Sequence, residues 1–393
     1  MHLRRNKDEK TIGLVLAGAM VLSLAACGQG NGGSAQDDGT TFRIGGIGPL
    51  TGNNAIYGNA VMNGAQMAVD EINADGGING VQLEFDFQDD ESDAERAVNA
   101  YNQLKDWGMD MLVGTTTSSP CEAVVARSNE DNMFQITPSA TSVNSIQYEN
   151  AFRMCFSDPS QGTASADYIA ENGLASKIGI IYDSSDTYSS GIASAFESEA
   201  QAKGLEIVSK EAFTGESNTD FSVQLQKAKD AGAELLFLPI YYTQTALILA
   251  QADTIGFEPL IFGSDGFDGI LDVDNFDKSL AEGVMFLTPF STNSTDELTQ
   301  NFVQKYEEQF GGTPNQFAAD AYDSVYVIKQ AAEQAGLTAD MSASEMCDAL
   351  KTAMTEISFT GLTGKDIQWG ADGEPQKAPI VVQVENGEYQ ILQ

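Results

Sequence analysis

The stretch that decides the fold spans residues 42–87 and reads FRIGGIGPLTGNNAIYGNAVMNGAQMAVDEINADGGINGVQLEFDF. Residues 42–48 and 81–87 are typical of β-strands. Between them, small and apolar side chains recur at helical spacing over residues 58–74, and Gly76-Gly77 predicts the end of that helix. A strand, a helix and a second strand of these lengths form a β-α-β unit, whose strands pair in parallel. The stretch therefore predicts an α/β fold with parallel sheets.

The same alternation continues along the chain, with a restart after Asp158. Further strands are expected at residues 111–113, 133–136, 152–156, 178–182, 206–212, 235–239 and 259–262. Helices are expected at residues 91–107, 120–129, 162–171, 190–203, 221–231, 243–255, 295–310 and 317–335. Two runs of β-α units predict two doubly wound lobes. Ligands bind beyond the carboxyl ends of parallel strands, so we expect a cleft between the lobes.

The N-terminus predicts export. A basic head precedes a short apolar run that ends in LAAC at residues 24–27, as in a secretory signal peptide. The LAAC ending resembles the lipobox of bacterial lipoproteins, which implies a signal peptide over residues 1–26 and an acylated Cys27. The Gly-rich residues 27–41 then form a tether. The alternative is an ordinary signal peptide with a chance cysteine.

The amino-acid composition disfavours several classes of function. The 393 residues include 57 acidic and 20 basic ones, for a net charge of −37, which disfavours nucleic acid as a partner. The single histidine is His2, so the exported chain lacks the imidazole that catalytic triads and many metal sites use. We expect no catalytic residues, metal or cofactor. An enzyme with paired carboxylates remains an alternative.

Three cysteines follow Cys27, and an extracytoplasmic location permits a disulfide. Cys121 and Cys155 both lie near predicted strand ends of the first lobe, so we expect them to pair. Cys347 lies in an apolar helical pattern and is expected to be a buried free thiol.

Polar loops follow several predicted strands. In GTTTSSPCE (residues 114–122), Ser119 is expected as the N-cap of a helix, with Pro120 at its first position and Glu122 completing a capping box. Such a helix start favours a carboxylate. Asp265, after another strand, offers an acceptor for an ammonium group. Each loop alone could equally be a capped helix or a turn, but together they suit an α-amino acid.

Several pieces of sequence carry a family resemblance: the opening GGIGPLTGNNAIYGNAVMNGAQMAVDEINADGGING, QDDESD, GTTTSSP, ITPSAT, FSDPSQG and FGSDG. With them the chain resembles the type I periplasmic-binding family, in particular the leucine/isoleucine/valine-binding proteins of ABC importers. The resemblance implies a first lobe of residues 42–157 and 290–378 and a second lobe of residues 158–289 and 379–393. A three-stranded hinge, with crossovers near Asp158, Pro289 and Pro379, would join them.

The resemblance also implies a ligand site and its roles. Ser118 and Thr141 would hold the ligand carboxylate, and Asp265 would face its ammonium group. Ser139 and Thr141 would also accept hydrogen bonds from the ammonium. The aromatic residues would close over the ligand or form its walls. The implied site residues are Tyr57, Thr116, Thr117, Ser118, Ser139, Ala140, Thr141, Tyr188, Tyr241, Asp265 and Phe317.

The implied protein is a monomeric, membrane-anchored lipoprotein that passes a small amino acid, first of all a branched-chain one, to the permease subunits of an ABC importer. The aspartate at 265 is shorter than glutamate, and Thr116 and Thr117 make the wall more polar than in branched-chain binders. These departures leave another small amino acid, an amide or urea open as the ligand. A lipoprotein that senses the ligand for a receptor is the other alternative.

Overall fold

The computed structural model describes residues 40–392. The predicted signal peptide, the acylated Cys27 and nearly all of the tether lie outside these residues. Within residues 40–392, no helix combines the length and the apolar character needed to cross a membrane.

The first lobe is built on a sheet of five parallel strands in the order β2-β1-β3-β4-β5. The strands are β1 (Thr41–Gly48), β2 (Gln82–Asp89), β3 (Met111–Gly114), β4 (Phe134–Thr137) and β5 (Ala151–Arg153). Apolar side chains cover both faces of the central strands, since Met111 and Val113 belong to one core cluster and Leu112 belongs to another. Both faces are therefore packed against helices, as parallel sheets require.

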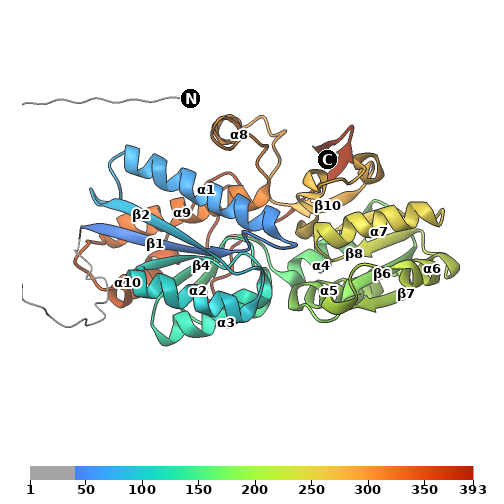
Figure 1. Ribbon diagram of the computed structural model, residues 1–393, viewed down its shortest axis with the longest axis horizontal. Helices are drawn as coiled ribbons and strands as arrows, with labels where there is room; N and C mark the ends of the chain where they lie inside the picture. The colour runs from blue at the N-terminus through green and yellow to red at the C-terminus, as the bar shows by residue number, and fades with distance from the viewer. Residues whose placement is uncertain (1–39, 393) are drawn as a thin grey trace, which may run out of the picture. The chain divides into compact units, whose positions relative to one another are not determined.

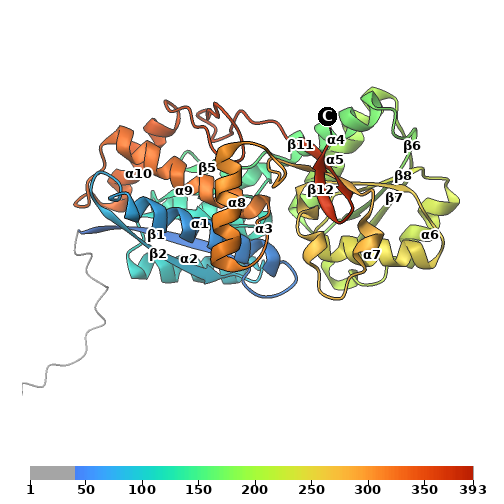
Figure 2. The same cartoon turned by 90° about the horizontal axis from the view of Figure 1, so that it is seen from above.

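Helices α1 (Ala55–Ala74) and α9 (Gln316–Ala335) pack on one face of this sheet, and α2 (Ala94–Trp107) and α3 (Ser118–Glu130) on the other (Figure 1). Gly64 permits the close approach of α1 to α9, because a β-carbon there would collide with the backbone carbonyl of Ala318. Helix α8 (Glu297–Phe310) lies beside α1, and α10 (Ala343–Met354) lies beside α9 (Figure 2).

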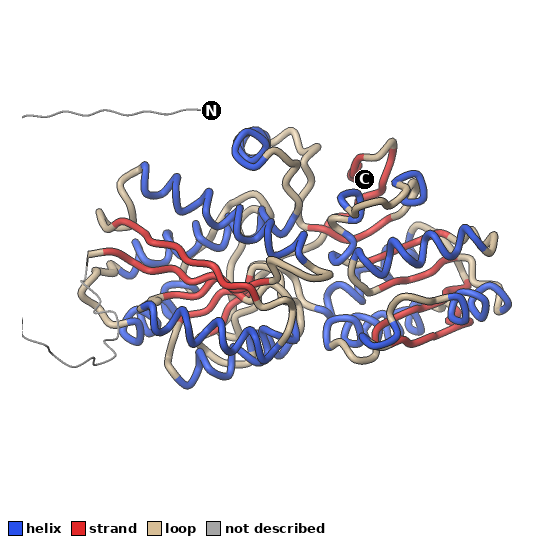
Figure 3. The backbone as a smooth tube through the Cα atoms, in the orientation of Figure 1, coloured by secondary structure: helices blue, strands red, loops and turns tan. Residues whose placement is uncertain are grey.

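The second lobe has a seven-stranded sheet in the order β12-β11-β10-β9-β8-β6-β7. Its parallel strands are β6 (Lys177–Asp183), β7 (Glu206–Phe213), β8 (Leu235–Leu238), β9 (Leu260–Gly263) and β10 (Met285–Thr288). Helices α4 (Asp158–Glu171) and α5 (Thr187–Lys203) pack together on one face, and α6 (Ser222–Asp230) and α7 (Tyr242–Thr254) on the other. The two-lobe α/β fold expected from the sequence is confirmed (Figure 3).

The second sheet departs from a purely parallel arrangement at one edge. Strand β11 (Ile380–Glu385) pairs antiparallel with β10, and β12 (Glu388–Ile391) pairs antiparallel with β11. Asn386 and Gly387 between them both have positive φ, the conformation that a two-residue hairpin turn requires.

The chain passes between the sheets after β5, after β10 and before β11. Two of these connections are tied together by Lys377, whose Nζ donates to the Met154 carbonyl and to Asp320 Oδ1, both at 2.9 Å. Lys377 and Asp320 side chains are only 2% exposed, so the ion pair lies in the interior. The lobe limits at residues 157/158, 289/290 and 378/379 stay predictions.

The expected Cys121–Cys155 disulfide is wrong, because both residues are buried free thiols. Cys121 lies on α3, where its Sγ contacts the Ser145 carbonyl and the side-chain amide of Gln135. Cys155 instead has Asp320 of α9 and Lys377 among its charged neighbours. Cys347 is buried and free, as expected.

Candidate functional site

Two loops of the first lobe meet at the start of α3. The loop after β3 leads through Thr117, the N-cap residue, into Ser118, the first residue of the helix. The backbone N–H groups of Thr141 and Ser142, in the loop after β4, each donate to Ser118 Oγ at 3.2 Å. The Ser118 hydroxyl keeps its own proton for donation to a further acceptor.

The helix start differs from the sequence prediction. Ser119 was expected as the N-cap, but the helix begins two residues earlier than predicted, with Thr117 in that position. Glu122 does not close a capping box, because its carboxylate accepts a hydrogen bond from the Ser142 hydroxyl. The Ser142 hydroxyl therefore engages the carboxylate that the predicted capping box would need.

A buried guanidinium group donates hydrogen bonds to the loop after β4. Arg153, at the end of β5, is fully buried. Its Nη1 donates to the carbonyls of Ala140 and Thr141, and its Nη2 donates to the Ser142 carbonyl at 3.0 Å. Its Nε lies 3.0 Å from Glu374 Oε2. No local pattern in the sequence points to this residue, since a charged residue at a strand end is usually exposed.

The second lobe contributes a buried carboxyl group. Asp265 follows β9, and its Oδ1 accepts a hydrogen bond from the Tyr188 hydroxyl at 2.8 Å. Its backbone N–H donates to Gln161 Oε1 at 3.0 Å. Burial raises the pKa of Asp265 to about 7, although the hydrogen bonds from Tyr188 and Gln161 oppose the rise. A positively charged group beside it would stabilise the ionised form.

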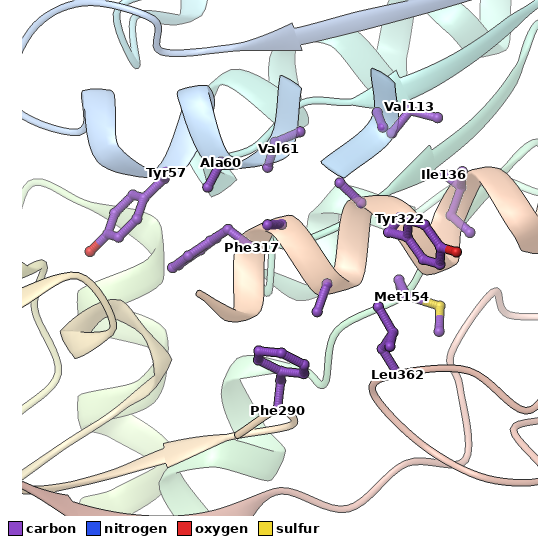
Figure 4. Close-up of a cluster of buried hydrophobic side chains, with 14 of the residues drawn as sticks. Tyr57, Ala60, Val61, Val113, Ile136, Met154, Phe290, Phe317, Tyr322 and Leu362 are labelled. Carbon is purple, nitrogen blue, oxygen red and sulfur yellow. The ribbon is translucent and has the colours of Figure 1, made fainter. Parts of the chain in front are cut away.

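Four aromatic rings lie between the Ser118 region and Asp265. Tyr188 stacks on Tyr241 with ring centroids 4.7 Å apart, and Tyr57 packs against Phe317 at 4.1 Å. Figure 4 shows Tyr57 on α1 and Phe317 on α9 at one end of the buried apolar cluster. The Tyr57 hydroxyl donates to the carbonyl of Gly266 in the second lobe and accepts from the Tyr242 N–H. These contacts hold the two lobes together across the site.

These groups surround one small cavity, which we call the inner cavity. Its volume of about 10 Å³ admits roughly one water-sized sphere. An amino acid therefore enters only when the lobes separate. Its lining residues are Tyr57, Thr116, Thr117, Ser118, Ser139, Tyr188, Tyr241, Asp265, Gly266 and Phe317.

All the predicted site residues except Ala140 and Thr141 line the inner cavity. Thr141 does not line the cavity; its N–H donates to Ser118 and its carbonyl accepts from Arg153. Thr116 presents little polarity to the cavity, since its hydroxyl points toward the Ile47 carbonyl. Gly266 was missed as a lining residue, although it belongs to the quoted FGSDG motif.

Comparison with known proteins adds independent observations. Residues 41–388 match the family described as "Periplasmic binding protein". A relative from Brucella melitensis, "Leu/Ile/Val-binding protein homolog 3", is 32% identical over 76% of this chain and 81% of that protein. The "Leucine-, isoleucine-, valine-, threonine-, and alanine-binding protein" of Pseudomonas aeruginosa is 28% identical over 83% of this chain and 86% of that protein.

Solved structures show the same architecture. The branched-chain amino acid transporter substrate binding protein LivJ from Streptococcus pneumoniae, in complex with isoleucine, aligns with a TM-score of 0.81 and 31% identity, over 90% of this chain and 99% of that one. The leucine binding protein LivK from Thermotoga maritima aligns with a TM-score of 0.81 and 26% identity, over 90% and 98% of the two chains.

Proposed function

Since the chain belongs to the periplasmic binding protein family, we propose that it captures a small amino acid, first of all a branched-chain one, and delivers it to an ABC importer. Acylation of Cys27 would tether it to the outer face of the cell membrane. The names of the relatives support the ligand class, since they are binders of leucine, isoleucine and valine. The family is one of solute-binding proteins, so we propose no catalytic step.

The two ends of the ligand would meet opposite lobes. The carboxylate would accept hydrogen bonds from the Ser118 hydroxyl and from free N–H groups at the start of α3, where the helix dipole favours negative charge. The ammonium would pair with Asp265, with the Ser139 carbonyl as a further acceptor. The buried carboxyl of Asp265, which lines the inner cavity together with Ser118 and Ser139 of the first lobe, is the observation that carries this proposal.

Closure would follow from contacts that exist only when the lobes meet. In the open form the amino acid would lie against Ser118 and Ser139 of the first lobe. Asp265 and Tyr188 would reach it on closure, and the Tyr57 hydroxyl would then bond to Gly266. A ligand shifts an equilibrium only through such differential contacts. Charged hydrogen bonds of about 1.5–3 kcal/mol each are large enough to offset the cost of ordering the hinge.

The test is calorimetric titration of the protein with leucine, isoleucine, valine, alanine, threonine and urea. We expect a branched-chain amino acid to bind best and to be recovered unchanged. Asp265→Asn keeps the size of the side chain but removes its charge, and is expected to weaken leucine binding by at least about tenfold. Tyr241→Phe is the matched control within the same cavity. Equal affinities for leucine in the wild type and in Asp265→Asn would contradict the proposal. Uptake by membranes that contain the importer would separate delivery from sensing.

A further inference from the structure

A second cavity adjoins the inner cavity at the rim of the cleft, and we call it the rim cavity. Its volume is about 440 Å³. Thr117 and Tyr241 line both cavities, so the rim cavity continues from the inner one between these two side chains. Asn54 of the first lobe and Gln244 of α7 face it from opposite sides.

Three residues that line the rim cavity each have a buried side-chain oxygen that accepts no hydrogen bond within the described part of the chain: Thr117 Oγ1, Asn54 Oδ1 and Gln244 Oε1. Thr117 is 5% exposed, and Asn54 and Gln244 are 9% exposed. The Asn54 amide is oriented by its Nδ2, which donates to Ser92 Oγ at 3.0 Å. Leaving a buried acceptor without a partner costs about 1–3 kcal/mol. The lining residues therefore hold three acceptors that a donor on a guest could satisfy.

The charge of the wall points to a cationic donor. Glu91, Asp183 and Asp186 line the rim cavity; no lysine or arginine is among its lining residues, although Glu91 forms an ion pair with Arg96 outside the lining. Burial and the neighbouring Asp183 raise the pKa of Asp186 to about 6. Among the described residues, no group of carboxylates and thiols is arranged to hold a metal ion. An organic ammonium or guanidinium group satisfies both the charge and the acceptors.

We propose that the rim cavity receives the positively charged end of a ligand side chain, so that the site also binds amino acids such as lysine, whose side chain ends in an ammonium group. The inference rests on the proposed function, because the α-amino and α-carboxyl groups stay in the inner cavity. The side chain then runs between Thr117 and Tyr241, and its end donates to the buried oxygens of Asn54 and Gln244.

Lysine and norleucine make a matched pair of probes, since they share the four-carbon side chain and differ by the terminal ammonium. We expect lysine to compete with leucine and to bind more tightly than norleucine, measured by calorimetry. If norleucine binds and lysine does not compete with leucine, the inference is overturned while the proposed function stands. If leucine, norleucine and lysine all fail to bind, the proposed function itself fails.

Gln244→Leu removes one buried acceptor with little change in size. It is expected to weaken lysine binding by about tenfold, as for a hydrogen bond to a charged group, and to leave leucine binding unchanged. Gln103→Leu, on the exposed side of α2, is the control. If Gln244→Leu does not fold, the double variant Glu91→Gln/Asp183→Asn tests the same cavity through its charge, with the same expectation. Unchanged lysine affinity in the folded variant contradicts the inference. Guanidinium ion that binds together with leucine but does not compete with lysine would also overturn it, since the ion and the lysine side chain would then not share the rim cavity.

Discussion

The phenol oxygen of Tyr57, on α1 of the first lobe, lies 2.5 Å from the carbonyl oxygen of Gly266 in the second lobe. The same phenol oxygen accepts a hydrogen bond from the Tyr242 N–H at 3.2 Å. One hydroxyl group therefore satisfies a donor and an acceptor of the opposite lobe. Both backbone groups are buried in this arrangement and would return to water when the lobes separate.

Tyr57→Phe keeps the ring against Phe317 but leaves these two backbone groups without their partner in the closed form. Because the penalty falls on the closed form alone, leucine affinity is expected to fall by about tenfold, at the lower end of 1–3 kcal/mol for an unpaired buried group. Calorimetry checks the affinity, and small-angle scattering checks the separation of the lobes. Tyr168→Phe, on α4 outside the cavity, is the control. Unchanged affinity in Tyr57→Phe would mean that the Tyr57 hydroxyl contributes nothing to closure.

Binding should depend on pH through Asp265. In the closed arrangement of the lobes burial raises the pKa of this carboxyl to about 7, and a bound ammonium would lower it. Binding therefore releases a proton below pH 7, and affinity is expected to fall by up to about tenfold for each pH unit below 7. Titrations between about pH 8 and about pH 5.5 measure this slope. Asp158 and Asp186 lie nearby with raised pKa values of their own, so Asp265→Asn is the control. A slope that persists in Asp265→Asn would assign the effect to another carboxyl.

Arg153→Met removes the donors that face the carbonyls of Ala140, Thr141 and Ser142. Since these carbonyls are buried, the free energy of unfolding is expected to fall by about 3 kcal/mol. Arg153→Lys keeps the charge but not the planar fork, so it should restore only part of the loss. Urea denaturation measures the effect, with Arg127→Met as the control because Arg127 is exposed in a surface ion pair. A loss no greater than that of Arg127→Met would contradict a supporting role for Arg153.

The free thiols of Cys121 and Cys155 make a simple prediction. A reducing agent should leave the melting temperature unchanged, because there is no bond between them to break. Both thiols should also react with a thiol reagent only after unfolding, since burial raises the pKa of each. A melting temperature that drops on reduction would show that the two cysteines are joined in the purified protein.

Local patterns were sufficient to predict most of the fold. The first strand was expected at residues 42–48 and is observed at Thr41–Gly48. Helix α1 was expected from residue 58 but begins at Ala55. Its N-cap residue, Asn54, makes no side-chain capping bond, so no capping interaction marks the start of the helix. The hairpin β11–β12 was not predicted, although Asn386-Gly387 between apolar runs is a recognisable turn signal.

Local patterns predicted the site less well where segments far apart in the sequence form hydrogen bonds with the same side chain or backbone group. The Ser142 hydroxyl donates to Glu122, which therefore does not form the predicted capping box. The N–H of Thr141 donates to Ser118 and is therefore not free to face the cavity. Arg153 could not be identified from sequence, because only the packing of β5 against the loop after β4 makes a charged residue favourable in the interior. Such pairings depend on tertiary contacts that no window of the sequence contains.

Arg153 connects the loop beside the inner cavity to a segment that joins the two lobes. Its guanidinium touches the loop beside the inner cavity at one end and, at the other, Glu374 in the segment that returns the chain to the second lobe. A substitution in that returning segment can therefore retune ligand affinity without altering any residue that lines the inner cavity. Directed evolution toward new ligands should accordingly find useful mutations far from the pocket, along the polypeptide bridges that join the halves.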